Sequence, residues 1–217
     1  MSVYKTILFD LDGTLTDSAP GVTNSIRYAL SKFGITEDDP RKLLRFIGSG
    51  LDDSFREIYS FSDQQASDAV DYYREYFREI GINEHTIYPG IKDLLSDLSE
   101  QGCRLCTATL KPKIFTEIIL KHYEIFDVLQ VIGAPDLSEK RINKSVIIKR
   151  VLEKLPNVNL SETVMVGDRD HDIEGAKENG IASIAVSWGY GSEEEIRNSD
   201  PDYIANNVKG LRDILTH

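Results

Sequence analysis

The chain has 217 residues, of which 41% are hydrophobic and 28% are charged. This composition is ordinary for a globular protein, and the length suffices for one α/β domain with an insertion or for two small domains. The net charge of −11 and the isoelectric point of about 4.9 exclude a nucleic-acid binder held by phosphate contacts. They do not exclude a small phosphorylated substrate, because a bound cation reverses the local charge.

Two features favour a cytoplasmic protein. No apolar run approaches the ~18 residues that cross a bilayer, and the first residues lack the pattern of a signal peptide.

The two cysteines, Cys103 and Cys106, are spaced as C-x-x-C. This spacing can mark a redox pair or half a zinc site, but no second pair accompanies it, so we expect two small core residues in a reducing compartment.

The first predicted strand, Thr6–Phe9, runs directly into two carboxylates, Asp10 and Asp12. Residues two apart point to the same side of a strand, and Gly13 indicates that the strand ends here. Neighbouring carboxylates repel each other unless a cation lies between them. The segment therefore predicts a metal-assisted reaction in which one carboxylate can act as a nucleophile.

From residue 16 to about residue 85 the pattern is helical. Pro20 suits the first turn of one helix, and Ser62 with Gln65 makes a capping-box signature for another. A connection of roughly seventy residues is too long for a loop, so we predict an all-helical domain over residues 16–85, inserted after the first strand. The alternative is two or three ordinary crossover helices on the sheet.

The rest of the chain alternates apolar runs with helical patterns, which predicts a Rossmann-like, three-layer α/β core with a parallel sheet over residues 1–15 and 86–217. The predicted strands after the first are Leu105–Thr109, Val128–Ile132, Thr163–Val166 and Ser183–Val186.

Further polar residues are expected to converge at the carboxyl edge of this sheet, where such folds bind ligands. Thr109 ends one strand, Asp168 follows another, and Lys144 and Asp172 begin helices. Singly, each has an ordinary explanation: Asp172 as a helix cap, Lys144 as a solvated residue and Thr109 as strand content. Together they fit phosphoryl transfer, which needs a nucleophile, an acid, carboxylate ligands for Mg²⁺ and groups that hold phosphoryl oxygens. Asp10 would be the nucleophile and Asp12 the acid. Thr109 and Lys144 would bind the phosphoryl oxygens.

In this order, the residues resemble the four motifs of the haloacid dehalogenase superfamily of phosphohydrolases. The motifs are Asp10-Leu-Asp-Gly-Thr, Thr109, Lys144 and Gly167-Asp-Arg-Asp-His-Asp172. The helical insertion resembles the C1 cap of that superfamily, and the nearest branch is the phosphoglycolate phosphatase-like group, which includes 5′-nucleotidases.

The resemblance implies a role for each matching residue. Asp10 would be the nucleophile, and Asp12 the general acid and base, with its backbone carbonyl on Mg²⁺. Asp168 would ligate the metal, and Asp172 would support it directly or through water. Thr109 and Lys144 would bind the transferring phosphoryl group.

Three further positions are expected to contact substrate or border the site. Leu110 stands where many relatives have Asn or Ser, which leaves only its backbone amide for phosphate. Arg45 and Gly48 lie in a segment that resembles the group's substrate-specificity loop, with a plain helix–helix turn as the alternative. Gly189-Tyr190-Gly191 is interpreted as a mobile loop beside the active site.

We therefore predict a Mg²⁺-dependent phosphatase that hydrolyses a small phosphorylated metabolite through an aspartyl phosphate, with no nucleic-acid or membrane partner. A sugar phosphomutase on the same scaffold is an alternative, although Thr14 fits the phosphatase branch better by family analogy. A phosphorylation-switched signalling module is a rival from another class. The chain length and Asp12 count against it.

Overall fold

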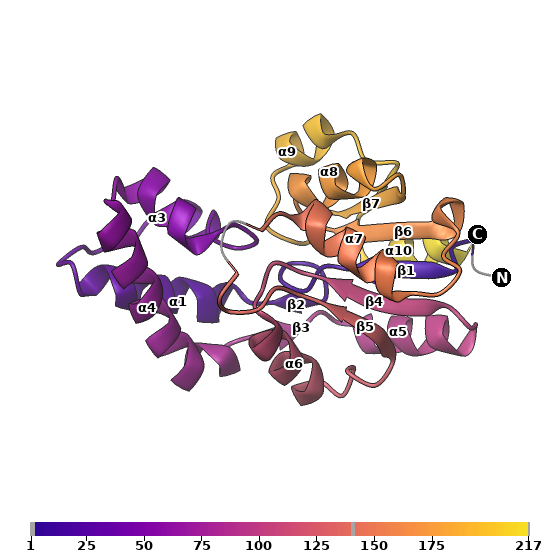
Figure 1. Ribbon diagram of the computed structural model, residues 1–217, viewed down its shortest axis with the longest axis horizontal. Coiled ribbons are helices and arrows are strands. Elements are labelled where there is room, and N and C mark those ends of the chain that lie inside the picture. The colour runs from indigo at the N-terminus through magenta and orange to yellow at the C-terminus, as the bar shows by residue number, and fades with distance from the viewer. Residues whose placement is uncertain (1–2, 140–141, 217) are drawn as a thin grey trace. The chain divides into compact units, whose positions relative to one another are not determined.

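A computed structural model describes residues 3–139 and 142–216 (Figure 1). The chain forms two compact units, one made of residues 1–16 and 87–217 and the other of residues 17–86. The first unit contains the main sheet and is called the core unit below. The second contains the helices inserted after the first strand and is called the helical unit.

The core unit is built on a six-stranded parallel sheet with the order β5-β4-β1-β6-β7-β8. Its strands are β1 (Thr6–Phe9), β4 (Arg104–Ala108), β5 (Leu129–Gly133), β6 (Thr163–Gly167), β7 (Ala182–Val186) and β8 (Tyr203–Ala205). The first five confirm the predicted strands with shifts of one residue at some ends. Two short strands, β2 (Thr16–Asp17) and β3 (Thr86–Ile87), pair with each other outside this sheet.

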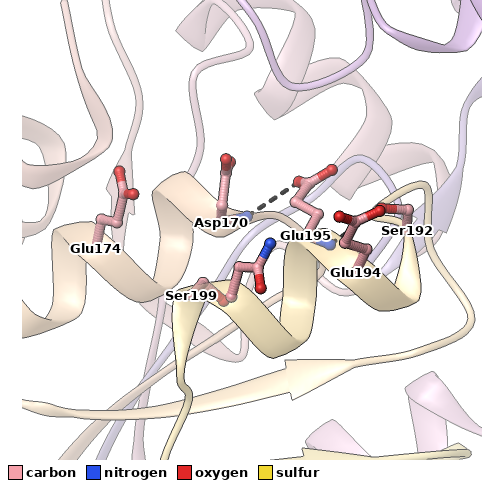
Figure 2. Close-up of a pocket in the computed structure, with 7 residues that line it drawn as sticks. Asp170, Glu174, Ser192, Glu194, Glu195 and Ser199 are labelled. Carbon is pink, nitrogen blue, oxygen red and sulfur yellow. Dashed lines mark hydrogen bonds between the residues drawn. The ribbon is translucent and has the colours of Figure 1, made fainter.

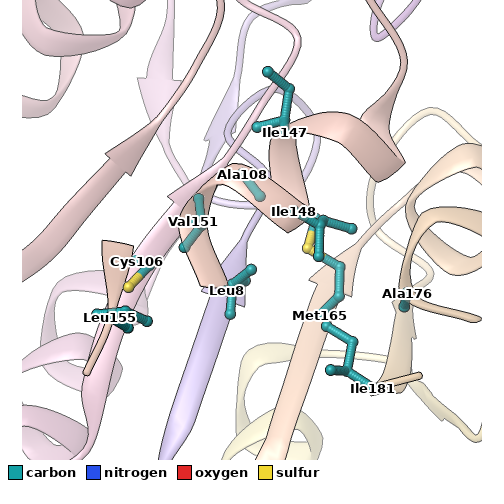
Figure 3. Packing of buried hydrophobic residues seen from close by; sticks show 10 residues of the cluster. All are labelled: Leu8, Cys106, Ala108, Ile147, Ile148, Val151, Leu155, Met165, Ala176 and Ile181. Carbon is teal, nitrogen blue, oxygen red and sulfur yellow. The ribbon is translucent and has the colours of Figure 1, made fainter. Parts of the chain in front are cut away.

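Helices flank the sheet. They are α5 (Ile91–Glu100), α6 (Lys113–His122), α7 (Lys144–Lys154), α8 (Asp170–Glu178), α9 (Glu193–Ser199) and α10 (Val208–Thr216). A short 3₁₀ turn, η2 (Leu160–Glu162), precedes β6. Figure 3 shows how α7 and α8 pack on the sheet: Leu8, Cys106 and Met165 from three neighbouring strands meet Ile148 and Val151 of α7. All five side chains are fully buried. This packing fixes α7 over the centre of the sheet and so sets the position of its first residue, Lys144.

The helical unit consists of α1 (Ala19–Ser31), α2 (Pro40–Leu44), α3 (Leu51–Tyr59), α4 (Asp63–Glu79) and the 3₁₀ turn η1 (Gly81–Asn83). The predicted capping box is confirmed, because the Ser62 amide donates to Gln65 Oε1 at 3.0 Å and the Gln65 amide donates to Ser62 Oγ at 3.3 Å. Gly21 permits close contact between α1 and η1, since a Cβ there would lie 2.2 Å from the Gly81 carbonyl oxygen.

The cysteines are core residues. Cys103 and Cys106 are both buried and free, and burial raises the pKa of Cys106 to about 12. Such a thiol is unreactive near neutral pH. Within residues 3–139 and 142–216, no helix combines the length and apolar character needed to cross a membrane.

Candidate active site

The position of β1 in the sheet creates the site. β1 lies between β4 and β6, so the strand order reverses on either side of it, and ligands bind at such switch points. Phe9 is in register with Thr107 of β4 and Val166 of β6. The residues that follow these three strands therefore emerge at one edge, which brings the Asp10, Thr109 and Asp168 segments together as predicted.

Three buried carboxylates form the centre of the site. One oxygen each from Asp10, Asp168 and Asp172 lies within 4.8 Å of the others. Lys144 Nζ lies 2.8 Å from Asp10 Oδ1 and 2.7 Å from Asp172 Oδ1, and it donates a hydrogen bond to the Ala108 carbonyl at 2.9 Å. Lys144 is 2% exposed, which excludes the alternative of a solvated helix residue.

The electrostatics of this group are unbalanced, because the Lys144 ammonium pairs with two of its three carboxylates, Asp10 and Asp172. Burial raises the pKa of Asp10, and the charge of Lys144 only partly opposes this effect. Burial and the charges of Asp10 and Asp172 raise the pKa of Asp168 well above its usual range. Burial alone would lower the pKa of Lys144, but the two carboxylates outweigh burial and raise it. The site therefore carries excess negative charge that a cation would neutralise.

The surroundings of Asp168 fix its orientation. The Tyr190 amide donates to Asp168 Oδ2 at 2.7 Å, and the Thr14 hydroxyl lies 3.4 Å from Oδ1. Gly13 has a φ of +86° and could not carry a Cβ, which would lie 2.2 Å from Asp168 Oδ2; at Gly189 a Cβ would lie 2.3 Å from Asp168 Cβ. The Gly189-Tyr190-Gly191 segment thus holds a carboxylate in place. Its predicted mobility stays a prediction.

Asp172 combines the two roles that the sequence left open. Its Oδ2 accepts a hydrogen bond from the Arg169 amide at 3.2 Å at the beginning of α8, while its Oδ1 pairs with Lys144. The Asp172 carboxylate is therefore both a cap for α8 and a member of the carboxylate group.

Residues on α9 support the start of α8. Glu195 Oε1 accepts hydrogen bonds from Arg169 Nε at 2.6 Å and from the Asp170 amide at 3.1 Å. Burial alone would lower the pKa of Arg169, but Glu195 outweighs burial and raises it.

Asp12 has a partner that the sequence analysis did not single out. Lys111 Nζ lies 2.8 Å from Asp12 Oδ2, with the two side chains 5% and 9% exposed. Asp12 Oδ1 is buried and accepts no hydrogen bond from the described residues. The Lys111 amide in turn donates to Thr109 Oγ1 at 3.2 Å. The fully buried Thr109 therefore sits beside the Asp12–Lys111 pair.

Comparison with known families agrees with this geometry. Residues 7–186 match the family model of haloacid dehalogenase-like hydrolases. The chain belongs to the haloacid dehalogenase-like hydrolase family. This result confirms the family resemblance and the prediction of an enzyme.

Curated relatives of this hydrolase carry different names. A 5′-nucleotidase of Pseudomonas aeruginosa is 39% identical over 98% of this chain and 96% of its own length. The tyrosine-protein kinase PtkA of Mycobacterium tuberculosis is 32% identical over 96% and 72%. A phosphoglycolate phosphatase of Vibrio vulnificus is 30% identical over 97% and 96%.

A solved structure confirms the fold class of the hydrolase. The crystal structure of a predicted phosphatase from Clostridium acetobutylicum is 42% identical, covers 98% of each chain and superposes with a TM-score of 0.92. The predicted α/β fold with a parallel sheet and a helical insertion is therefore correct.

The other predicted substrate residues lie in two places. Leu110 belongs to the core unit and packs against the cluster under α7. Arg45 and Gly48 belong to the helical unit, where Arg45 is exposed just after α2 and Gly48 adopts a φ of +80°. Their contacts with substrate stay predictions.

A concave surface of the hydrolase lies between α8 and α9. Figure 2 shows this pocket of ≈ 380 Å³, where Asp170 and Glu174 of α8 face Glu194 and Glu195 of α9. Its lining is acidic, with no lysine or arginine, so it does not suit a phosphorylated ligand.

The carboxylate group fits a divalent cation. Apart from Lys144, Asp10 Oδ1 and Asp172 Oδ1 have no hydrogen-bond partner among the described residues, although both are buried. Mg²⁺ binds carboxylate oxygens together with waters and substrate phosphate. The donor set consists of hard oxygen ligands without histidine or cysteine, which favours Mg²⁺ over Zn²⁺.

Proposed function

We propose that this hydrolase cleaves small phosphomonoesters through an aspartyl phosphate on Asp10. The observation that carries the proposal is the group of Asp10, Asp168 and Asp172 at the switch point of the sheet, in which the buried Lys144 pairs with Asp10 and Asp172. Perturbed pKa values cluster at functional sites, where burial and like charges shift them.

Asp10 is the proposed nucleophile. It is 2% exposed and held from one side by Lys144, so one carboxylate oxygen has a defined position. Attack on phosphorus forms the Asp10–phosphorus bond as the bond to the leaving oxygen breaks. Holding the carboxylate in one position lowers the entropic cost of this attack.

Asp12 is the proposed general acid and base. It gives a proton to the leaving oxygen in the first step and takes one from water in the second, when water attacks the phosphorus and releases Asp10. The charge of Asp12 acts on Asp10, two residues earlier, and this proximity supports the assignment.

Asp10, Asp168 and Asp172 are the proposed Mg²⁺ ligands, with the backbone carbonyl of Asp12. When bound, Mg²⁺ supplies positive charge that offsets the negative charge of the carboxylates and of the phosphoryl oxygens. Thr109 is proposed to hold a phosphoryl oxygen by its hydroxyl. Lys144 offsets charge as well, but its ammonium already contacts Asp10, Asp172 and the Ala108 carbonyl.

The proposed substrate class is a small phosphorylated metabolite, such as phosphoglycolate or a nucleoside monophosphate. The names of two relatives, 5′-nucleotidase and phosphoglycolate phosphatase, support this class. Arg45 and Gly48 of the helical unit are proposed to select among such substrates.

The test is phosphate release from p-nitrophenyl phosphate and from a panel of phosphorylated metabolites. We expect turnover with Mg²⁺, loss of turnover in EDTA and recovery when Mg²⁺ is added back. We expect Asp10→Asn to fold normally and to release no phosphate. Turnover by this variant, or turnover independent of metal, contradicts the proposal. An isomeric sugar phosphate in place of free phosphate would indicate the mutase.

A further inference from the structure

Lys111, like Lys144, is a buried lysine of the core unit, and the proposed mechanism gives it no task. Its backbone is fixed on both sides, because its amide donates to Thr109 Oγ1 at 3.2 Å and its carbonyl accepts from Thr116 Oγ1 at 3.1 Å. Pro112 follows and precedes α6. The side chain therefore starts from a fixed point beside the sheet edge.

The ammonium of Lys111 ends on Asp12. Nζ lies 2.8 Å from Oδ2, and both residues are buried, so solvent weakens the pair little. Burying a lysine costs free energy, and a lysine buried only for packing could be replaced by an apolar residue. The pair therefore points to a task that needs the Asp12 carboxylate in one orientation.

The two oxygens of Asp12 differ as a result. Oδ2 is occupied by Lys111, whereas Oδ1 is buried and accepts no hydrogen bond from the described residues. A carboxyl that transfers a proton needs one oxygen in reach of the leaving group, and a misplacement of about 1 Å can cost about 100-fold in rate.

We propose that Lys111 is a positioning residue for Asp12: its ammonium holds Oδ2 so that Oδ1 exchanges the proton. This inference rests on the proposed function. As Asp10 bonds to phosphorus and the ester P–O bond breaks, the proton on Oδ1 goes to the leaving oxygen. In the second step Oδ1 takes a proton from the attacking water, the Asp10–phosphorus bond breaks and phosphate leaves. Lys111 keeps its own protons throughout.

The leaving group provides the test. p-Nitrophenolate is stable without a proton, whereas an alkoxide is not, so only alkyl esters depend strongly on the general acid. For Lys111→Met we expect kcat/KM, which reports only the first step, to fall at least about tenfold more on an alkyl phosphate than on p-nitrophenyl phosphate. Asp12→Asn should show the same selectivity.

Lys113 supplies the matched control. It lies two residues further on, its side chain is 47% exposed, and it is 3.9 Å from Glu117. Lys113→Met should leave both rates within about twofold of the wild type. Equal losses of kcat/KM on both esters in Lys111→Met would overturn the proposal, because Lys111 would then bind phosphate or only support the fold.

A second comparison covers the case in which Lys111→Met does not fold. The double variant Asp12→Asn, Lys111→Met removes both charges and leaves neither one buried without a partner. If Lys111 acts through Asp12, the double variant should hydrolyse the alkyl ester within about threefold of Asp12→Asn alone. A further loss of tenfold or more would contradict the inference.

The outcomes also separate this inference from the proposed function. A wild-type protein without phosphatase activity, or an active Asp10→Asn variant, refutes the proposed function. A wild-type enzyme that depends on Asp10 but shows no leaving-group selectivity in Lys111→Met refutes only the role of Lys111.

Discussion

The ammonium of Lys144 lies 2.8 Å from Oδ1 of Asp10, and both side chains are at most 2% exposed. The lysine begins α7, and the aspartate follows the central strand β1. A buried pair of this kind fixes the nucleophile against a rigid helix. It also limits the repulsion between Asp10 and Asp172, which contact the same ammonium.

Removing this ammonium should destabilise the fold. Lys144→Met leaves Asp10 and Asp172 buried without their cation, and breaking a buried pair in this way costs about 3–5 kcal/mol. Urea unfolding in EDTA measures the loss. Lys149→Met, an exposed position on the same helix, should change the free energy of unfolding by no more than about 0.5 kcal/mol. Equal stability of the two variants would show that Lys144 is not needed to balance the carboxylates.

Neutralising Asp168 should have the opposite effect in the absence of metal. Burial and the neighbouring carboxylates raise its pKa, so its ionisation in the folded state costs stability as pH rises above about 4, the ordinary value for aspartate. In EDTA at pH 7, Asp168→Asn should therefore melt above the wild type, by about 2–4 °C for each kcal/mol gained. The difference should shrink as the pH falls toward 4.

Asp170 is the control for this pH dependence. Its hydrogen bond with His171 lowers its pKa to about 2, so its ionised form stabilises the fold above pH ~4. Asp170→Asn should melt below the wild type at pH 7. A melting temperature for Asp168→Asn below that of the wild type in EDTA would mean that the three carboxylates do not strain the fold.

Gly189 should not tolerate a side chain. A Cβ at this position would lie 2.3 Å from Asp168 Cβ and 2.5 Å from the Gly13 carbonyl oxygen, so Asp168 must move. We expect Gly189→Ala to raise the Mg²⁺ concentration needed for half-maximal activity by about 10–100-fold, the usual loss of metal affinity when the support of a metal ligand is disturbed.

Gly210→Ala is the matched control, because a Cβ there would meet nothing nearer than 3.7 Å. In the helix α10, this change should leave the Mg²⁺ requirement intact and stabilise the protein by up to about 1 kcal/mol. If Gly189→Ala needed the same Mg²⁺ concentration as the wild type for half-maximal activity, the Gly189-Tyr190-Gly191 segment would not hold Asp168.

Glu195 should matter more than its neighbour Glu194. Glu195→Ala removes the acceptor of two hydrogen bonds, from Arg169 Nε and the Asp170 amide, and should cost about 1–3 kcal/mol. Glu194 is exposed in the same helical turn, so Glu194→Ala should be nearly neutral. Chemical denaturation of both variants measures the free energy of unfolding. Equal losses in the two variants would mean that the α8–α9 contact contributes little to stability.

Local sequence patterns predicted much of the fold. The capping box at Ser62 and the strand Thr6–Phe9 followed by Asp10 need only neighbouring residues to be recognised. β8 was missed because Tyr203–Ala205 is an edge strand of only three residues, two of them exposed, which is too short to give a recognisable strand pattern.

The supporting contacts of the site were less accessible to sequence reasoning. Lys111 pairs with Asp12, 99 residues earlier in the chain, and lysine is usually a surface residue. No local pattern indicated its burial. The support of Asp168 by the Tyr190 amide depends likewise on how two loops meet in space. The sequence pattern at Gly189-Tyr190-Gly191 indicated only backbone freedom.

Trapping the covalent intermediate tests the central claim most directly. The enzyme is mixed with Mg²⁺ and a substrate that it turns over, quenched in acid during turnover, and digested for peptide mass spectrometry. We predict one phosphoryl group on the peptide that contains Asp10, located on that residue and absent from Asp10→Asn. Turnover without a phosphoryl group on Asp10, or with one on another residue, would contradict the account.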